Sequence, residues 1–115
     1  METGFTQSSD GTSIAWYDFK GNGPDLLLSH ATGFCGQIWE PLLPYLQPHF
    51  RCVSYDLRGH GLSARPSDPN NGWDWHRYAD DAQAVINACG LSSPFGFGHS
   101  CGGATQVLLE EACPN

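Results

Sequence analysis

The sequence contains few basic residues. Lysine and arginine together number five against twelve aspartates and glutamates, which gives a formal net charge of −7. The basic residues are scattered along the chain, at Lys20, Arg51, Arg58, Arg65 and Arg77. A chain without a basic cluster lacks the electrostatic surface that holds nucleic-acid phosphates or anionic lipid headgroups. We therefore expect neither nucleic acid nor a membrane among its partners.

Long hydrophobic runs are also missing. No apolar stretch approaches the roughly 18 residues that a membrane-spanning helix needs. The segment from Met1 to Gln7 has neither the basic start nor the apolar centre of a signal peptide. These absences favour a cytoplasmic protein.

Cysteine is present but never in a C-x-x-C pair. Its five positions are Cys35, Cys52, Cys89, Cys101 and Cys113. An odd number without paired spacing favours neither a disulfide framework nor a zinc site. We expect small buried cysteines in a reducing compartment, with no metal ion.

The composition is that of a globular protein. Of 115 residues, 40% are hydrophobic and four are tryptophans, which suits one domain with a modest core over residues 1–115. We found no repeats, low-complexity tracts or linkers that would divide the chain.

Short apolar segments alternate with glycine- and proline-rich turns. Residues 4–8 and 13–19 flank a Ser-Asp-Gly-Thr turn and predict a β-hairpin. The continuous apolar run at 25–29 predicts a strand covered on both faces. Further strands are expected at 51–55 and after Pro94, leading to Ser100.

Helices are expected between these strands. Residues 38–46 have helical spacing but contain two prolines, which predicts a short helix. A longer amphipathic helix should begin after Asp74 and end at Gly90, and the last helix should end near Ala112. A hairpin followed by alternating strands and helices predicts an α/β fold with parallel strands.

Gly98, Ser100 and Gly102 form the pattern G-x-S-x-G between an apolar strand and a helix. This is the pattern of a nucleophile elbow, in which a serine lies on a strained strand-to-helix turn. Side chains two residues before and after the serine would collide as the chain reverses. The helix N-terminus directs free N–H groups toward the hydroxyl, where negative charge develops during attack.

Three loops follow the expected parallel strands, at 30–36, 56–63 and 98–102. In such sheets, functional sites form at the carboxyl ends of the strands. We therefore expect these loops to meet in space.

The three loops resemble motifs of the α/β-hydrolase family, in the family's order. His30-Ala31-Thr32-Gly33-Phe34 is similar to its His-Gly oxyanion loop with two extra residues. Residues 56–63, DLRGHGLS, resemble its D-x-R-G-x-G-x-S loop, and residues 98–103, GHSCGG, resemble its elbow. The resemblance covers essentially the whole chain and implies the N-terminal half of an α/β-hydrolase sheet, ending after the elbow helix.

The resemblance also implies roles for individual residues. Ser100 would be the nucleophile, and the backbone N–H of Cys101 one oxyanion donor. The second donor would be the backbone N–H of Phe34 or, as a second choice, Thr32.

The other elbow and loop positions would be supporting ones: His30, Gly98, His99 and Gly102. The resemblance implies no cofactor and a small-molecule, ester-like substrate. A serine nucleophile points away from the branches that use aspartate. Cleavage of an ester, lactone, thioester or C–C bond, and perhaloperoxidation without a cofactor, all remain open.

The chain departs from the family after Ser100. The family places the triad acid and histidine later in the sequence. Here only Glu110 and Glu111 follow as acids, with no histidine. Glu110 would lie roughly 15 Å from Ser100 at the rise of a helix. We expect a truncated hydrolase that lacks its own base and acid, because His30 and His60 are interpreted as structural.

A non-catalytic role is the alternative. An elbow strand without further strands beside it leaves a bare sheet edge, which favours pairing with a second copy or with a missing C-terminal half. A dinucleotide-binding module is disfavoured because no G-x-G-x-x-G follows the strand at 26–29.

The remaining polar and aromatic residues have structural interpretations. We expect His49 and His76 to be solvated and Arg58 to pair with Asp56 or a helix C-terminus. The four tryptophans are expected to be packing residues: Trp16, Trp39, Trp73 and Trp75.

Overall fold

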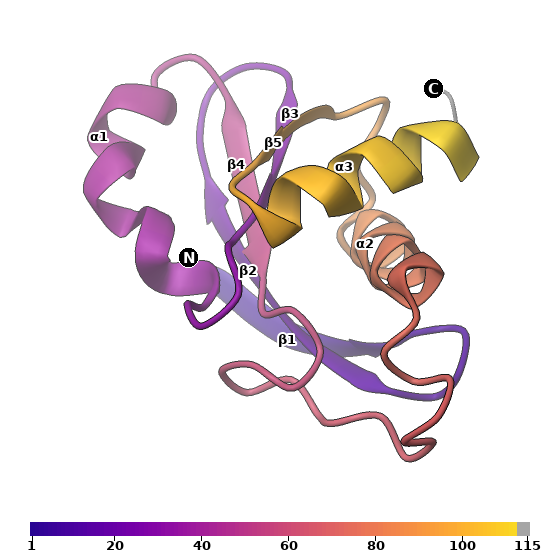
Figure 1. Ribbon diagram of the computed structural model, residues 1–115. Helices are drawn as coiled ribbons and strands as arrows, with labels where there is room; N and C mark the ends of the chain where they lie inside the picture. The colour runs from indigo at the N-terminus through magenta and orange to yellow at the C-terminus, as the bar shows by residue number, and fades with distance from the viewer. Residues whose placement is uncertain (113–115) are drawn as a thin grey trace.

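Five strands form one mixed sheet in the computed structural model, which describes residues 1–112 (Figure 1). The spatial order of the strands is β1-β2-β4-β3-β5. Their bounds are β1 (Glu2–Gln7), β2 (Ser13–Lys20), β3 (Asp25–Ser29), β4 (Arg51–Tyr55) and β5 (Phe95–Gly98). The hairpin β1–β2 is antiparallel, as is the β2–β4 pair, whereas β3 pairs in parallel with both β4 and β5. The predicted hairpin and parallel strands are confirmed.

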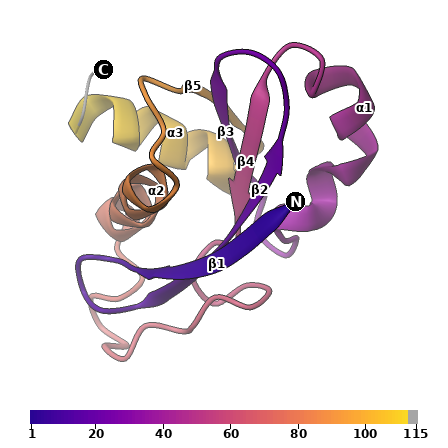
Figure 2. The same ribbon diagram turned by 180° about the vertical axis from the view of Figure 1, so that it is seen from behind.

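Helices cover both faces of the sheet, as Figures 1 and 2 show. The 3₁₀ helix η1 (Gly36–Leu42) and α1 (Leu43–Leu46) lie on one face. The helices α2 (Trp75–Cys89) and α3 (Cys101–Ala112) lie side by side on the other. Among residues 1–112, no helix combines the length and apolar character needed to cross a bilayer.

Strand β3 supplies the centre of both hydrophobic layers. Leu27 packs in the cluster shared with α2 and α3, which includes Val53, Ala82 and Val85. Leu26 and Leu28 pack in the opposite cluster, which includes Trp39 of η1. Alternate residues of a strand point to opposite faces, so a continuous apolar run is what a doubly covered strand requires.

Proline decides the geometry of the segment after β3. Pro41 lies inside η1, and the following α1 has only four residues with a proline in its first turn. Proline removes a backbone donor and clashes with the preceding turn, so a long helix cannot form here. The predicted short helix over 38–46 is confirmed, with much of it in the 3₁₀ form.

Helix α2 begins and ends at the predicted residues. The Asp74 carboxylate accepts a 2.9 Å hydrogen bond from the His76 amide. Gly90 ends the helix in the left-handed region, at φ 64°. Both arrangements satisfy backbone groups that a helix end leaves without partners.

Arg58 corrects one prediction. It pairs neither with Asp56 nor with a helix C-terminus. Its fully buried guanidinium donates to Asp81 of α2 at 2.8 and 2.6 Å and to Asp10 in the β1–β2 turn at 2.9 Å. It also donates to the carbonyl oxygen of Gly72 at 2.6 Å. The sequence pattern missed these partners because they are 48, 23 and 14 residues away along the chain.

The two carboxylates around Arg58 differ in exposure. The side chain of Asp81 is fully buried, and burial raises its pKa. Asp10 keeps 18% of its side chain exposed, and hydrogen bonds from Arg58 lower its pKa. A guanidinium matches a carboxylate with two parallel donors, so Arg58 fixes α2 against the loop that follows β4.

Asp56 instead anchors the loops around it. Its buried carboxylate accepts from the Tyr17 hydroxyl at 2.6 Å and from the Gly36 and Leu62 amides at 2.7 and 2.9 Å. Gly61 lies against this carboxylate at φ 50°, where an added Cβ would collide with it. The D-x-R-G-x-G spacing therefore has a structural basis at both its acid and its second glycine.

His30 joins two of the three loops from inside. Its Nε2 accepts the Leu57 amide at 2.9 Å, so Nδ1 carries the proton and donates to the Ala31 carbonyl at 2.7 Å. Burial lowers the pKa of His30. The ring of His60 meets the His30 ring edge-on at 5.2 Å. The structural interpretation of both histidines agrees with these contacts.

The tryptophan and cysteine predictions hold only in part. Trp39 is buried and Trp16 packs against the core, but Trp73 and Trp75 are 40% and 51% exposed. Of the free cysteines in the described residues, Cys52 is buried and the other three are half-buried: Cys35, Cys89 and Cys101. Cys113 lies outside the described residues. His49 and His76 are exposed, as predicted.

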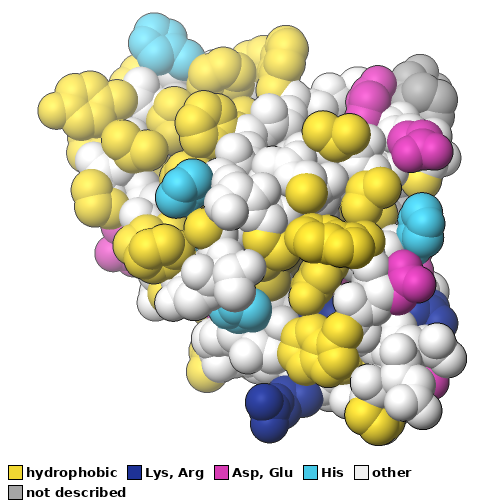
Figure 3. All heavy atoms as spheres, viewed as in Figure 1, with side chains coloured by type: hydrophobic (Ala, Val, Ile, Leu, Met, Phe, Trp, Pro, Cys, Tyr) yellow, Lys and Arg dark blue, Asp and Glu magenta, His cyan; other side chains and the backbone are white. Residues whose placement is uncertain are grey.

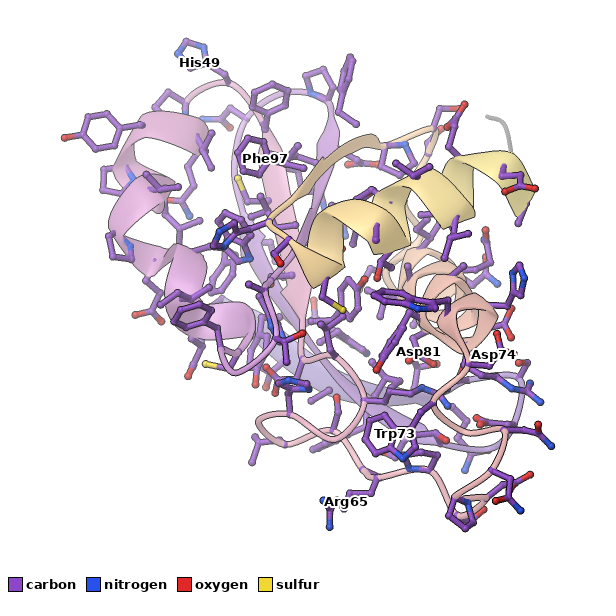
Figure 4. The ribbon with its side chains drawn as sticks, viewed as in Figure 1. His49, Arg65, Trp73, Asp74, Asp81 and Phe97 are labelled. Atoms are coloured by element: carbon purple, nitrogen blue, oxygen red, sulfur yellow. The ribbon has the colours of Figure 1, made fainter. Side chains whose placement is uncertain are left out.

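We predict that R58A strongly destabilises the fold. The substitution leaves the buried Asp81 carboxylate without its partner, which costs about 3–5 kcal/mol of unfolding free energy. Urea denaturation followed by tryptophan fluorescence measures this loss. R65A is the matched control. Arg65 is an exposed arginine on the outer loop and lies away from Asp81 on α2 (Figure 4), so its removal leaves the buried carboxylate paired. Equal losses in both variants would contradict the role of the buried pair.

We also predict that stability falls as pH drops below the ordinary histidine pKa of 6.5, and that His30 causes part of this loss. The folded state keeps His30 neutral, whereas the unfolded state takes up a proton. The resulting slope is at most about 1.4 kcal/mol per pH unit. H30Q should flatten the pH dependence of the unfolding free energy, and H49Q, at an exposed site, should not. An unchanged slope in H30Q would show that His30 contributes nothing.

Candidate active site

The turn between β5 and α3 holds Ser100 in a strained conformation. Strand β5 ends at Gly98 and α3 begins at Cys101. Between them, Ser100 has φ 57°, in the left-handed region that residues with a side chain rarely adopt. Ser100 is exposed. Strain of this kind persists where surrounding contacts enforce it, and it occurs most often at functional sites.

Two glycines enforce the turn. A Cβ on Gly98 would overlap the backbone of Gly102, and a Cβ on Gly102 would overlap the carbonyl group of Ser29. Gly103 differs, because its nearest contact would be the Gly98 carbonyl oxygen at an ordinary 3.5 Å. The chain therefore reverses at Ser100 only because positions 98 and 102 carry no side chain.

The elbow rests on the end of β3. The His99 amide donates to the Ser29 carbonyl at 3.1 Å, and the His99 ring stacks on Phe34 at 6.4 Å. Through His30 and Leu57, the loop after β3 is bonded to the loop after β4. The prediction that the three loops meet is confirmed.

A network of hydrogen-bonded side chains holds the Ser29 hydroxyl. Its hydroxyl shares a 2.7 Å hydrogen bond with the Tyr55 hydroxyl and accepts from Gln106 Nε2 at 2.9 Å. Burial raises the pKa of Tyr55, so this group stays a neutral phenol. Gly96 leaves the space that the Gln106 side chain fills. The sequence did not lead us to predict this network. Gly96 was a signal for it, because a glycine inside a short apolar strand often marks a place where another group approaches the backbone closely.

The candidate oxyanion donors differ in what their amides contact. The amide of Cys101 is the first of α3 and has no protein acceptor among residues 1–112. The Phe34 amide donates to the Ala31 carbonyl at 3.1 Å, whereas the Thr32 amide has no acceptor within the described part of the chain. Of the two candidates in this loop, Thr32 is therefore the one with a free donor.

The histidines near the elbow are engaged in other contacts. Both ring nitrogens of His30 are used within the loops, and His60 Nδ1 contacts the Arg58 carbonyl at 2.9 Å. His99 is exposed and its ring packs on Phe34. Glu110 and Glu111 lie at the end of α3 remote from Ser100 (Figure 1). Nothing in these contacts gives Ser100 a base.

The thiol next to Ser100 packs inward. Cys101 is half-buried and contacts the cluster that includes Tyr55, Ala79 and Ala82. Over residues 1–112, no group of His, Cys, Asp and Glu side chains is arranged to hold a metal ion.

Known proteins are similar in sequence to most of this chain. The sequence profile described as "alpha/beta hydrolase fold" matches residues 24–109. A non-heme haloperoxidase of Rhodococcus erythropolis is 37% identical over 100 residues, which are 86% of this chain and 35% of that protein. A bifunctional esterase/perhydrolase of Acinetobacter calcoaceticus is 32% identical over 97% of this chain and 40% of its own.

A solved structure shows the same fold. An esterase from Rhodococcus sp. ECU1013 superposes with a TM-score of 0.85 at 33% identity, over 98% of this chain and 42% of that one. The chain thus spans between a third and a half of the length of these relatives. The matched profile covers all three loops of the candidate site. This chain belongs to the alpha/beta hydrolase fold family and corresponds to part of that fold.

Proposed function

We propose that this chain is part of a serine hydrolase that cleaves an ester or a related acyl bond, with Ser100 as the nucleophile. The observation that carries the proposal is the strained, exposed serine at φ 57° between two glycines, at each of which an added Cβ would overlap neighbouring backbone. The relatives support the substrate class, because two of them are named as esterases. The Acinetobacter relative is also named a perhydrolase, which keeps perhydrolysis open as a variant of the same acyl chemistry.

The chemistry assigns each part of the elbow a task. The Ser100 oxygen attacks the carbonyl carbon of the substrate, and the carbonyl oxygen becomes an oxyanion. The amide of Cys101 and that of Thr32, or Phe34 after its turn opens, would donate to this oxyanion. The dipole of α3 favours the same negative charge. The leaving alcohol departs and water then hydrolyses the acyl-serine.

The proton acceptor is proposed to come from outside these residues. The relatives are longer than this chain by the portion that it does not match. A histidine and an acid from that portion, in the same polypeptide or in a second one, would complete the triad. No cofactor is required by this chemistry. The four unpaired cysteines of the described residues support a cytoplasmic location.

A second candidate function is complementation through the edge of the sheet. Strand β5 is an edge strand, and Phe95 and Phe97 are 59% and 53% exposed. Phe97 lies on the η1 side, against Trp39 (Figure 4). On the α3 side, a groove of about 630 Å³ runs between α2, α3 and β5. Figure 3 shows hydrophobic side chains on the face of the molecule that bears α2 and α3. The occupant we favour is the unmatched portion of the fold, with a second copy as the other outcome.

We predict that Ser100 is required for ester hydrolysis. The chain should release p-nitrophenol from p-nitrophenyl acetate slowly, and added imidazole should accelerate this reaction by supplying the missing base. Imidazole alone also hydrolyses the ester, at a background rate that needs no serine. S100A should show only this background rate. The initial rate of p-nitrophenol release, followed by its absorbance, measures the difference between the two chains.

The control for this substitution is S93A. Ser93 is an exposed serine with positive φ that is not on the elbow, so its hydroxyl should be dispensable. Equal rates for the unchanged chain, S100A and S93A, with and without imidazole, would rule out catalysis by Ser100 in this chain and favour the complementing function.

A further inference from the structure

The chain contains two Asn-Gly pairs in different surroundings. Asn22-Gly23 lies between β2 and β3, and Asn71-Gly72 lies in the loop before α2. Neither pair has a part in the chemistry proposed for Ser100. Both share a reactivity that depends on the local backbone.

Asparagine before glycine can lose its amide group without an enzyme. The backbone nitrogen of the glycine attacks the side-chain carbonyl carbon of the asparagine, a C–N bond forms, and ammonia leaves with the transferred proton. Water then opens the cyclic imide to aspartate or isoaspartate. Glycine allows the ring to close because it has no Cβ and a flexible backbone. A glycine N–H held in a hydrogen bond, in a fixed turn, resists the attack.

The reacting groups of the pair Asn22-Gly23 are accessible. Both residues are exposed. The Asn22 amide donates to the Gln47 carbonyl at 2.8 Å, which fixes the backbone before the reacting groups. Within residues 1–112, neither the Gly23 N–H nor the Asn22 carboxamide has a hydrogen-bond partner. The nucleophile and the carbonyl it attacks are thus both unengaged.

The pair Asn71-Gly72 is held. Gly72 is buried; its N–H donates to the Asp68 carbonyl at 2.9 Å and its own carbonyl accepts from Arg58 at 2.6 Å. The Asp68 carboxylate also accepts from the Asn71 amide and carboxamide, at 3.3 and 3.4 Å. Attack by the Gly72 nitrogen requires these contacts to open first.

We propose that Asn22 is a site of spontaneous deamidation in the folded chain, and that the hydrogen bonds of Asp68 and Arg58 to the Asn71-Gly72 pair protect Asn71 from the same reaction. The modification changes a tight connection. Gly21 and Gly23 approach the carbonyl oxygens of Phe50 and His49 so closely that neither has room for a Cβ. Isoaspartate adds a methylene to the backbone at this point, and the new carboxylate adds a negative charge to a chain already at −7.

The test incubates the folded chain at mildly alkaline pH and follows both pairs by peptide mapping with mass spectrometry, which separates asparagine, aspartate and isoaspartate peptides. Asn22 should convert at least about tenfold faster than Asn71, the ratio given by an opening cost of about 1.4 kcal/mol at the protected pair. In concentrated urea the two rates should approach each other. D68A, at an exposed residue, should accelerate Asn71 and leave Asn22 unchanged.

Comparable rates at the two pairs in the folded chain would overturn the proposal. The same rate ratio in the folded and the unfolded chain would also overturn it, because local sequence would then be the cause. A D68A chain whose Asn71 stays as slow as before would show that the Asp68 carboxylate does not protect Asn71, since D68A keeps the main-chain carbonyl that holds the Gly72 N–H.

Discussion

The close approach of Gly102 to the carbonyl group of Ser29 is the contact on which the candidate site depends. It places the first turn of α3 directly on the end of β3, and a side chain at position 102 would prevent it. The His99 amide bonds to the same carbonyl, so strand and turn are joined on both sides of Ser100. With its neighbours fixed, Ser100 has no relaxed conformation to adopt, and its hydroxyl stays outside the helix.

The surrounding structure supports that contact rather than the hydroxyl itself. Ser29 is held from below by Tyr55 and Gln106, and the loop that follows it is held by His30 and Asp56. Arg58 holds α2 in the same way, through its hydrogen bonds to Asp81, and α2 packs beside α3. These buried polar groups all have partners, as burial requires. Together these hydrogen bonds bring the loops after β3 and β4 and the turn at Ser100 to the same edge of the sheet.

Much of this could be predicted from local sequence. The apolar run at β3, the cap at Asp74 and the glycine spacing around Ser100 each act over a few residues, so their physical meaning is visible in the sequence. The partners of Arg58 and the Ser29–Tyr55–Gln106 chain were missed because they join segments far apart. The engaged amide of Phe34 was missed for a different reason: a turn hydrogen bond depends on backbone angles that an unusual loop sequence does not specify.

The free energies of unfolding of G102A and G103A test the central contact most directly. The two glycines are neighbours in the same helix, yet only position 102 lacks space for a methyl group. G102A should lose about 1–3 kcal/mol or more through overlap with the Ser29 carbonyl. G103A should keep its stability or gain up to about 1 kcal/mol from helix propensity. Equal stabilities would contradict the dependence of the elbow on this contact.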